Sequence, residues 1–309
     1  MAARLGAGDH CASPHHHHLR AAAVQPTGFP PQGQGTGGSV RMNVSEKKLW
    51  AAWSRLLNGL VGAMLIGFLV PILVVVAVSF QSKSYLSFPP TDFSLRWYQQ
   101  FIGNDDYRSA ILNSMMIGAA AAALATIAGI STALAVVRAS VPGSTIVSAL
   151  SVAPAILPQI VLAIGLFPIS VWLGLQGTLW AVILAHAVIG LPFPFITVCG
   201  ALASYSNRIE IASMTLGANS FQTFRLITFP MIRPAVIAGF IFAFAASLDE
   251  LVLALFLSSP STRTLPLLLW EQLNFQVTPE IAAAASVILA VTSLLILAAT
   301  LLPRLGKDN

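Results

Sequence analysis

The chain has 309 residues, of which 56% are hydrophobic and only 9% are charged. Soluble globular domains carry about 25% charged residues, so this composition excludes a soluble domain and indicates an integral membrane protein. The long apolar stretches favour helices over a transmembrane barrel, and the net charge of +5 then bears on membrane topology and does not indicate nucleic-acid binding.

Residues 1–41 form a tail that is rich in Gly, Pro, His and Ala and has no apolar periodicity, so we expect it to be disordered. Its histidines, His15–His18, are not accompanied by a second cluster of ligands, and no metal site is predicted. Cys11 and Cys199 lie in unlike surroundings and predict no disulfide. Met42 opens a more usual amino-terminal sequence, and translation from Met42 is a hypothesis for the origin of the tail.

Six apolar stretches follow, and residues 42–309 are predicted to form one all-α membrane domain with six transmembrane helices. The third stretch contains Pro154, Pro158 and Pro168, so we expect it to be kinked or broken where neighbouring helices satisfy the freed backbone groups. With six spans, both ends of the domain lie on one side of the membrane. The spans are expected at about residues 56–80, 110–137, 145–173, 179–202, 235–257 and 281–302.

Two connections between the spans are expected at the outer surface. The connection at residues 81–109 carries Trp97 and Tyr98, a pair suited to a membrane interface, and should include a short amphipathic helix. The connection at residues 258–280 should form a short re-entrant or interfacial segment.

The longest polar interruption, residues 204–234, lies between the fourth and fifth spans and is expected outside the membrane. Asn207 precedes Glu210 by three residues, which is the spacing of a capping box at the start of a helix. Gly217 supplies the left-handed residue that ends such a helix. A first short helix is therefore predicted before Gly217.

A second short helix is predicted after this glycine. Ser220 can cap it, Phe221 and Phe224 share one of its faces, and Pro230 and Pro234 are expected to end it before the next apolar stretch. The segment should therefore form two short helices around a glycine bend on the membrane surface. This shape fits a docking element, and it also fits an interfacial hairpin without a partner.

The basic residues predict which side of the membrane the segment occupies. If the amino terminus is cytoplasmic, all but four of the 16 Lys and Arg residues lie on the inner side. The positive-inside rule then places residues 204–234 in the cytoplasm, together with both ends of the chain. The four on the outer side are Lys83, Arg96, Arg108 and Arg263.

Two adjacent carboxylates, Asp249 and Glu250, fall inside the predicted fifth span. A charged side chain near the middle of a membrane costs about 2.5 to 3.5 kcal/mol, so both should face a cavity or a partner. They are candidates for a cation-attracting wall of a transport path, and Ser247 shares a helix face with Glu250. The alternatives are a structural pair bonded to a neighbouring helix, or a span end close to the outer interface.

His186 also lies in an apolar span, where a single histidine is more often a packed, hydrogen-bonded residue than a ligand or a proton relay. The sequence lacks the Gly-x-x-x-x-Gly-Lys-Ser/Thr phosphate-binding loop, since Gly306-Lys307-Asp308 has none of the rest of that motif. No catalytic residue, metal site or cofactor is predicted. If transport uses ATP, another subunit must hydrolyse it.

The order of residues in the 204–234 segment resembles the EAA loop of ABC-importer permeases, the cytoplasmic segment that inserts into a groove of the ATPase. The resemblance rests on Ala212, on Gly217 five positions later, and on the Ile-Thr-Phe-Pro ending at residues 227–230. In the family a glutamate lies six residues before the glycine, where this chain has Ile211. The resemblance implies an ATPase-coupling loop that contains Glu210, Ala212, Gly217 and Pro230, and whether Glu210 takes the place of the family glutamate is open.

Other stretches resemble the permeases of spermidine/putrescine ABC importers, specifically the second of their two permease subunits. They are FSLRWYQQF before the second span, Leu-Asp-Glu-Leu at residues 248–251 and Thr-Leu-Pro at residues 264–266. The resemblance covers about residues 58–302 and implies the type I ABC-importer permease architecture in a bacterial inner membrane. It also implies three kinds of partner: a second homologous permease, two cytoplasmic ATPase subunits, and a periplasmic or extracellular substrate-binding protein.

The sequence leaves alternatives open for the substrate and for the class of transporter. A polyamine cation would suit Asp249 and Glu250, but related permeases carry ferric iron, phosphonates, amino acids or other small solutes. A secondary transporter with Asp249, Glu250 and His186 as a proton relay predicts an internal repeat, and the first three spans show no convincing similarity to the last three. A third alternative is a membrane scaffold without transport.

Overall fold

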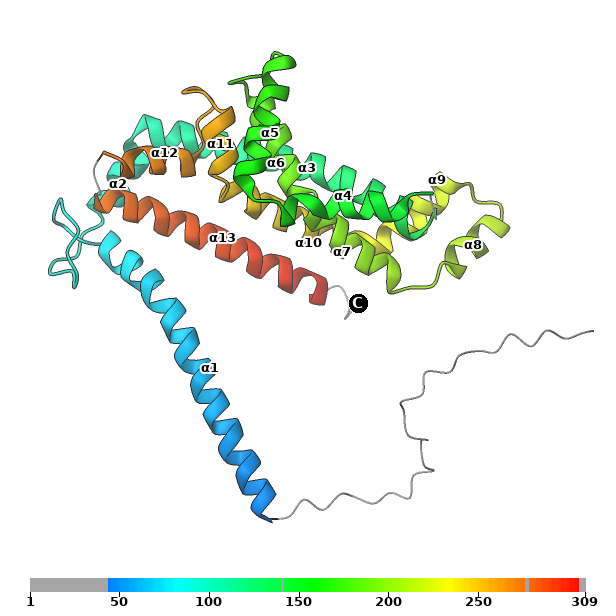
Figure 1. Ribbon diagram of the computed structural model, residues 1–309, viewed down its shortest axis with the longest axis horizontal. Helices are drawn as coiled ribbons and strands as arrows, with labels where there is room; N and C mark the ends of the chain where they lie inside the picture. The colour runs from blue at the N-terminus through cyan, green and yellow to red at the C-terminus, as the bar shows by residue number, and fades with distance from the viewer. Residues whose placement is uncertain (1–43, 140–141, 276–277, 306–309) are drawn as a thin grey trace, which may run out of the picture. The chain divides into compact units, whose positions relative to one another are not determined.

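The computed structural model describes residues 44–139, 142–275 and 278–305, and their regular elements are helices, apart from an isolated bridge between Gln81 and Phe93 (Figure 1). The tail predicted at residues 1–41 lies outside the described residues. The chain divides into two compact units, Met1–Val61 and Gly62–Asn309, and α1 (Val44–Ser79) crosses the boundary. The second unit contains α2 (Arg96–Gly103), α3 (Asp105–Val137), α4 (Ser144–Ile156), α5 (Gln159–Trp172), α6 (Leu179–Gly190), α7 (Pro192–Ala203), α8 (Arg208–Thr215), α9 (Ser220–Thr223), the π-helical turn η1 (Phe224–Thr228), α10 (Phe229–Leu248), α11 (Val252–Leu257), α12 (Leu265–Leu273) and α13 (Pro279–Leu305).

The helices are long and apolar enough to give six membrane spans among the described residues, which confirms the all-α fold predicted from the sequence. Five spans are unbent stretches, and the sixth is the bent pair α4 and α5, counted as one. The five stretches are Ala52–Ser79, Asp105–Val137, Leu179–Ala203, Ser220–Leu248 and Pro279–Leu301.

The centre of the second unit is a bundle in which α3 packs against α6, α7 and α10, while α10 also packs against α13 (Figure 1). Glycines let these helices approach closely. A Cβ atom on Gly239 of α10 would lie 2.6 Å from the Cα of Pro194 in α7, and one on Gly129 of α3 would lie 2.9 Å from the backbone nitrogen of Phe195. Small residues at such crossings are what holds helices together in lipid, where apolar burial between helices gives little driving force.

The third span is broken, as its prolines predict. The axes of α4 and α5 differ by 110°. The break lies at Leu157 and Pro158, and Leu157 is extended with ψ of 139° because the residue before a proline disfavours the helical conformation. Pro154 and Pro168 lie inside α4 and α5 without ending them.

The predicted start of the fifth span at residue 235 is wrong, because Pro230 and Pro234 do not end the preceding helix. The helical stretch runs without a break from Ser220 to Leu248. Pro234 lies inside α10, and Pro230 lies in the first turn of α10, directly after the π-helical turn η1, in which the amide of Phe229 bonds the carbonyl of Phe224. The wider turn accommodates a residue that lacks an N–H group and that would clash in a regular α-helix.

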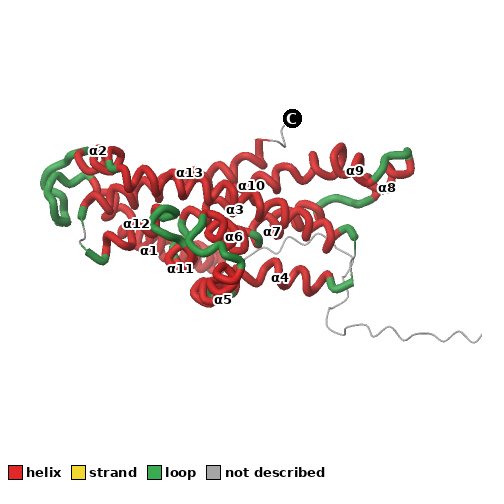
Figure 2. The backbone as a smooth tube through the Cα atoms, turned by 90° about the horizontal axis from the view of Figure 1, so that it is seen from above, coloured by secondary structure: helices red, strands yellow, loops and turns green. Residues whose placement is uncertain are grey.

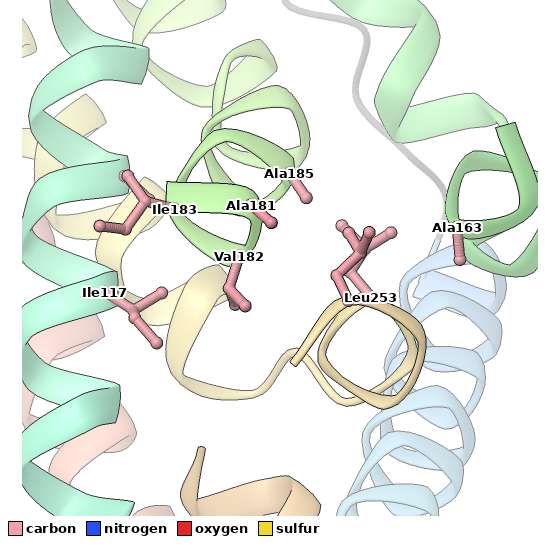
Figure 3. Packing of buried hydrophobic residues seen from close by; sticks show 9 residues of the cluster. Ile117, Ala163, Ala181, Val182, Ile183, Ala185 and Leu253 are labelled. Carbon is pink, nitrogen blue, oxygen red and sulfur yellow. The ribbon is translucent and has the colours of Figure 1, made fainter. Parts of the chain in front are cut away.

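The predicted end of the fifth span at residue 257 is wrong as well, because the helix breaks at Asp249. After Leu248 the chain forms a non-helical link, and α11 begins at Val252. α11 packs against α5 and α6, and Leu253 lies between Ala163 of α5 and Val182 of α6 (Figure 3). The two carboxylates therefore occupy a link between helices, not the interior of one helix.

The two ends of the bundle carry different elements. α8 and α9 lie at one end, and α2 and α12 lie at the other in both views (Figures 1 and 2). α2 is the short helix predicted beside Trp97, and it buries Trp97 and Phe101. α12 occupies the connection for which a re-entrant or interfacial segment was expected.

Candidate functional site

The 204–234 segment forms the predicted pair of short helices around a glycine bend. α8 ends at Thr215, and Gly217 has φ of +94°, the left-handed conformation that favours glycine. No side-chain cap is made by Asn207, whose backbone is itself helical, so the capping box predicted there is wrong. The capping box lies instead at α9, where Asn219 and Gln222 exchange side-chain and backbone hydrogen bonds of 2.8 and 2.9 Å.

Glu210 is the predicted site residue of this segment that the fold buries, with 9% of its surface exposed. Its Oε1 accepts hydrogen bonds from the hydroxyls of Tyr205, at 2.9 Å, and Thr228, at 2.8 Å. Burial raises the pKa of the Tyr205 phenol, so this hydroxyl keeps the proton that it donates. Ile211, at the position of the family glutamate, is 51% exposed, so the inward-facing acid of α8 is Glu210.

Arg138, the residue that follows α3, completes the surroundings of Glu210. Its Nε lies 3.0 Å from Oε2 of Glu210, and its Nη2 donates a 2.9 Å hydrogen bond to the carbonyl of Leu202 at the end of α7. Its guanidinium also lies over the ring of Tyr205, 4.7 Å from the centroid. The sequence predicted no role for Arg138, because its partners are distant along the chain.

The remaining predicted residues of this segment lie on its outside. Ala212, Gly217 and Pro230 are exposed. A hydrogen bond of 2.8 Å between the hydroxyls of Ser213 and Thr223 joins α8 to α9. The predicted site residues are thus divided between an inward acid and an outward face.

An apolar rim covers the outward face of the segment. Leu216 is 89% exposed and Phe221 is 69% exposed, so neither side chain packs into the interior of this chain. Exposed apolar patches with polar residues beside them mark sites of interaction with proteins or membranes. The rim consists of Ile209, Ile211, Met214, Leu216, Phe221 and Leu226.

Asp249 and Glu250 are adjacent in the chain but have opposite surroundings. Glu250 is only 2% exposed, and its Oε1 accepts a 2.8 Å hydrogen bond from the backbone N–H of Leu253 in the first turn of α11. Asp249 is exposed and lines a groove of about 330 Å³ together with Trp270 of α12. The rest of the groove is apolar and is lined by Leu251, Pro266, Leu269, Leu273, Ala285, Ile288 and Leu289.

His186 is packed inside the bundle, as the sequence favours for a single histidine in an apolar helix. It is 1% exposed, and its Nδ1 lies 2.7 Å from the hydroxyl of Ser247 in α10. Ser247 thus faces His186 of α6, and not the groove beside Asp249.

Comparison with protein families and curated proteins gives three matches of interest. The family described as "Binding-protein-dependent transport system inner membrane component" matches residues 125–307. The chain is 31% identical over 235 residues to the spermidine/putrescine transport system permease protein PotC of Escherichia coli (strain K12), and the aligned region covers 76% of this chain and 89% of that protein. It is 34% identical over 239 residues to the putrescine transport system permease protein PotI of the same organism, covering 73% and 84%.

Comparison with solved structures finds a similar fold in a crystal structure of a bacterial ABC transporter involved in the import of the acidic polysaccharide alginate. The TM-score is 0.61, and the match covers 82% of this chain and 97% of that chain. The two sequences are 16% identical, so this similarity concerns the fold alone.

Proposed function

Since the chain belongs to the family of binding-protein-dependent transport system inner membrane components and is a permease subunit of an ABC importer, we propose that residues 204–234 couple it to a separate ATPase in the cytoplasm. The observation that carries this proposal is the apolar rim on a segment whose backbone is fixed from inside by Glu210. A rigid hairpin with an exposed apolar face has the form of a docking element. A second homologous permease and a substrate-binding protein complete the proposed importer.

The distribution of basic residues supports a cytoplasmic position for this segment. Arg208, Arg225 and Arg233 belong to the larger group of 12 Lys and Arg residues, out of 16, that the sequence assigns to the inner side. Of the four expected outside, Lys83 lies in the loop before α2, Arg96 in α2, Arg108 in the first turn of α3 and Arg263 just before α12. Because basic residues gather on the cytoplasmic side, the α8–α9 end is proposed to face the ATPase. The α2–α12 end is then proposed to face the binding protein.

The docking proposal is tested by Leu216→Glu, which puts a charge in the middle of the rim at an 89% exposed position. The expected result is a loss of copurification of the ATPase with normal insertion of the permease in the membrane. The matched control is Phe275→Glu, because Phe275 is 90% exposed at the end of α12, on the far side of the bundle. Unchanged copurification with Leu216→Glu would show that the rim is not the docking face.

A polyamine is the substrate that we propose for this importer. The support comes from the two relatives, whose names specify spermidine and putrescine, and from the groove beside Asp249. A carboxylate and the indole of Trp270 both attract an alkylammonium group, and the apolar lining suits the methylene chain between two such groups. Asp249 is proposed to line the substrate path, and Glu250 to hold the backbone of the link in place.

The substrate proposal is tested by uptake of labelled putrescine and spermidine into cells that lack this gene and carry a wild-type or variant copy. Asp249→Asn should reduce uptake strongly because it removes the exposed charge. Glu250→Gln is the matched control, since the amide oxygen can still accept the bond from Leu253. Restored uptake with Asp249→Asn would discard the role of that residue, and absence of polyamine uptake with the wild-type gene would discard the substrate.

A further inference from the structure

Arg138 connects three parts of the chain that do not follow one another in sequence. It ends α3, its Nη2 binds the carbonyl of Leu202 at the end of α7, and its Nε lies 3.0 Å from the carboxylate of Glu210 in α8. Its cation also covers the ring of Tyr205, the residue in the link between α7 and α8. The short distances show that one planar side chain makes all of these contacts together, which a lysine could not do.

The hairpin formed by α8 and α9 needs a side-chain contact with the bundle at its α8 end. On the α9 side it continues through η1 into α10 as one helical stretch. On the other side, residues 204–207 join α7 to α8 without helix, so the backbone alone leaves α8 free to swing about this link. The other two groups that bind Glu210, the hydroxyls of Tyr205 and Thr228, both belong to the 204–234 segment itself. Among the described contacts of Glu210, Arg138 supplies the one from outside that segment.

The burial of the pair makes the loss of one partner more costly than at an ion pair on the surface. The side chains of Arg138 and Glu210 are 18% and 11% exposed. Exposed pairs contribute little because water and salt screen them, whereas removal of one partner from a buried pair leaves the other charge without compensation. A groove of about 430 Å³ lies beside the pair, between the end of α3 and the α8, α9 and η1 elements.

We propose that Arg138 is a positioning residue that makes α8 and α3 move as one body when the ATPase displaces the hairpin. α3 packs against α6, α7 and α10, so a displacement passed to α3 reaches the centre of the bundle. Without Arg138, α8 would turn about residues 204–207, and the bundle would not follow. This inference rests on the proposed docking of residues 204–234 onto an ATPase.

The experiment measures the distance between α8 and α3 in the transporter purified with its ATPase. Cysteines for spin labels replace Thr215 at the end of α8 and Ile127 of α3, both exposed, in a chain with Cys11→Ser and Cys199→Ala. Distances are recorded without nucleotide and with ATP plus vanadate, which replaces the phosphate released on hydrolysis and traps the ATPase with ADP. The variants are Arg138→Met and Arg138→Lys, and the control is Arg233→Met, which removes the charge of an exposed arginine in α10.

With Arg138 intact, in the wild type and in Arg233→Met, ATP should leave the distance unchanged. In Arg138→Met it should shift the mean by roughly 2 to 5 Å, the size of helix displacements in switching proteins, and Arg138→Lys should shift it less. A shift in the wild type, or none in Arg138→Met, would overturn the inference. If Arg138→Met does not reach the membrane, the same criteria apply to Arg138→Lys.

This experiment separates the inference from the docking proposal. Loss of the ATPase from both Arg138 variants would mean that Arg138 only keeps the hairpin folded for docking, and it would also overturn the inference. A wild-type permease that purifies without any ATPase would instead contradict the proposed docking itself.

Discussion

Single residues decide how closely the helices of the bundle approach one another. Gly239 of α10 faces the backbone of Pro194, where a Cβ atom would lie 2.6 Å from a Cα atom and from the hydroxyl of Thr197. Backbone atoms cannot move aside as the end of a flexible side chain can. Gly200 of α7 has no atom within 4 Å of its own Cβ position, so the same substitution meets open space there.

Gly239→Ala is therefore expected to destabilise the bundle by about 1 to 3 kcal/mol, the usual cost of overpacking. The matched control, Gly200→Ala, should be neutral or slightly stabilising because alanine is a better helix former. Thermal unfolding of the purified protein in detergent measures both. Equal midpoints for the two variants would contradict the close contact between α10 and α7.

Residues that act through distant partners are also where sequence reasoning fell short. The buried contacts of Arg138 with Glu210 and Leu202 lie far along the chain, and no local spacing indicates them. The spacing of Asn207 and Glu210 fits a capping box, but the side chain of Glu210 forms an ion pair with Arg138 and Asn207 makes no side-chain cap. The adjacent carboxylates show the same limit, since the sequence placed both in a span and the fold gives Glu250 a backbone partner.

At the scale of elements, the hairpin depends on its cap at α9 as well as on its ion pair. α9 has four residues and leads directly into the π-helical turn η1. So short a helix has few hydrogen bonds of its own, and the exchange between Asn219 and Gln222 satisfies amides that would otherwise lack partners.

Asn219→Ala should remove about 1 kcal/mol of local stability. We expect the backbone amides at residues 220–223 to exchange hydrogen faster than in the wild type, while the amides of α3 and α7 exchange at the wild-type rate. Asn219→Ser is the control, because serine also caps helices well. Equally slow exchange in the alanine variant would mean that packing, and not the cap, holds α9.

Elements that follow from local chemistry were predicted well. The glycine bend at Gly217 and the break at Pro158 both come from backbone preferences of one residue. The continuation of helix through Pro230 and Pro234 was not predicted, because proline usually ends a helix, whereas here Pro230 follows the π-helical turn η1 and Pro234 lies inside α10. The break at Asp249 was missed because the residues on both sides are equally apolar, and hydropathy alone cannot separate one long helix from two.

At the scale of the whole molecule, the six spans were predicted from the apolar stretches of the sequence, and the direction in which they cross the membrane remains a prediction. It rests on the count of basic residues along the sequence, of which all but four of 16 lie on the inner side if the amino terminus is cytoplasmic.

Single cysteines at Leu216 and Phe275, in a chain without Cys11 and Cys199, test the direction of crossing. Phe275→Cys should react with a membrane-impermeant maleimide in intact spheroplasts, and Leu216→Cys should react only after permeabilisation. Both positions are about nine-tenths exposed in this chain, and cells that lack the ATPase are used because the ATPase is proposed to cover Leu216. The opposite pattern would reverse the topology and place the hairpin outside the cell.

The link between α10 and α11 has an electrostatic consequence for what can pass beside it. Breaking a helix leaves the negative end of one backbone dipole next to the positive end of another. The carboxylate of Glu250 lies at the amino end of α11 and offsets its positive end. The carbonyl end of α10 is not offset in this way, and the charge of Asp249 adds to it. If Asp249 lines the substrate path, as proposed, these charges would make the groove negative and favour a cation over an anion.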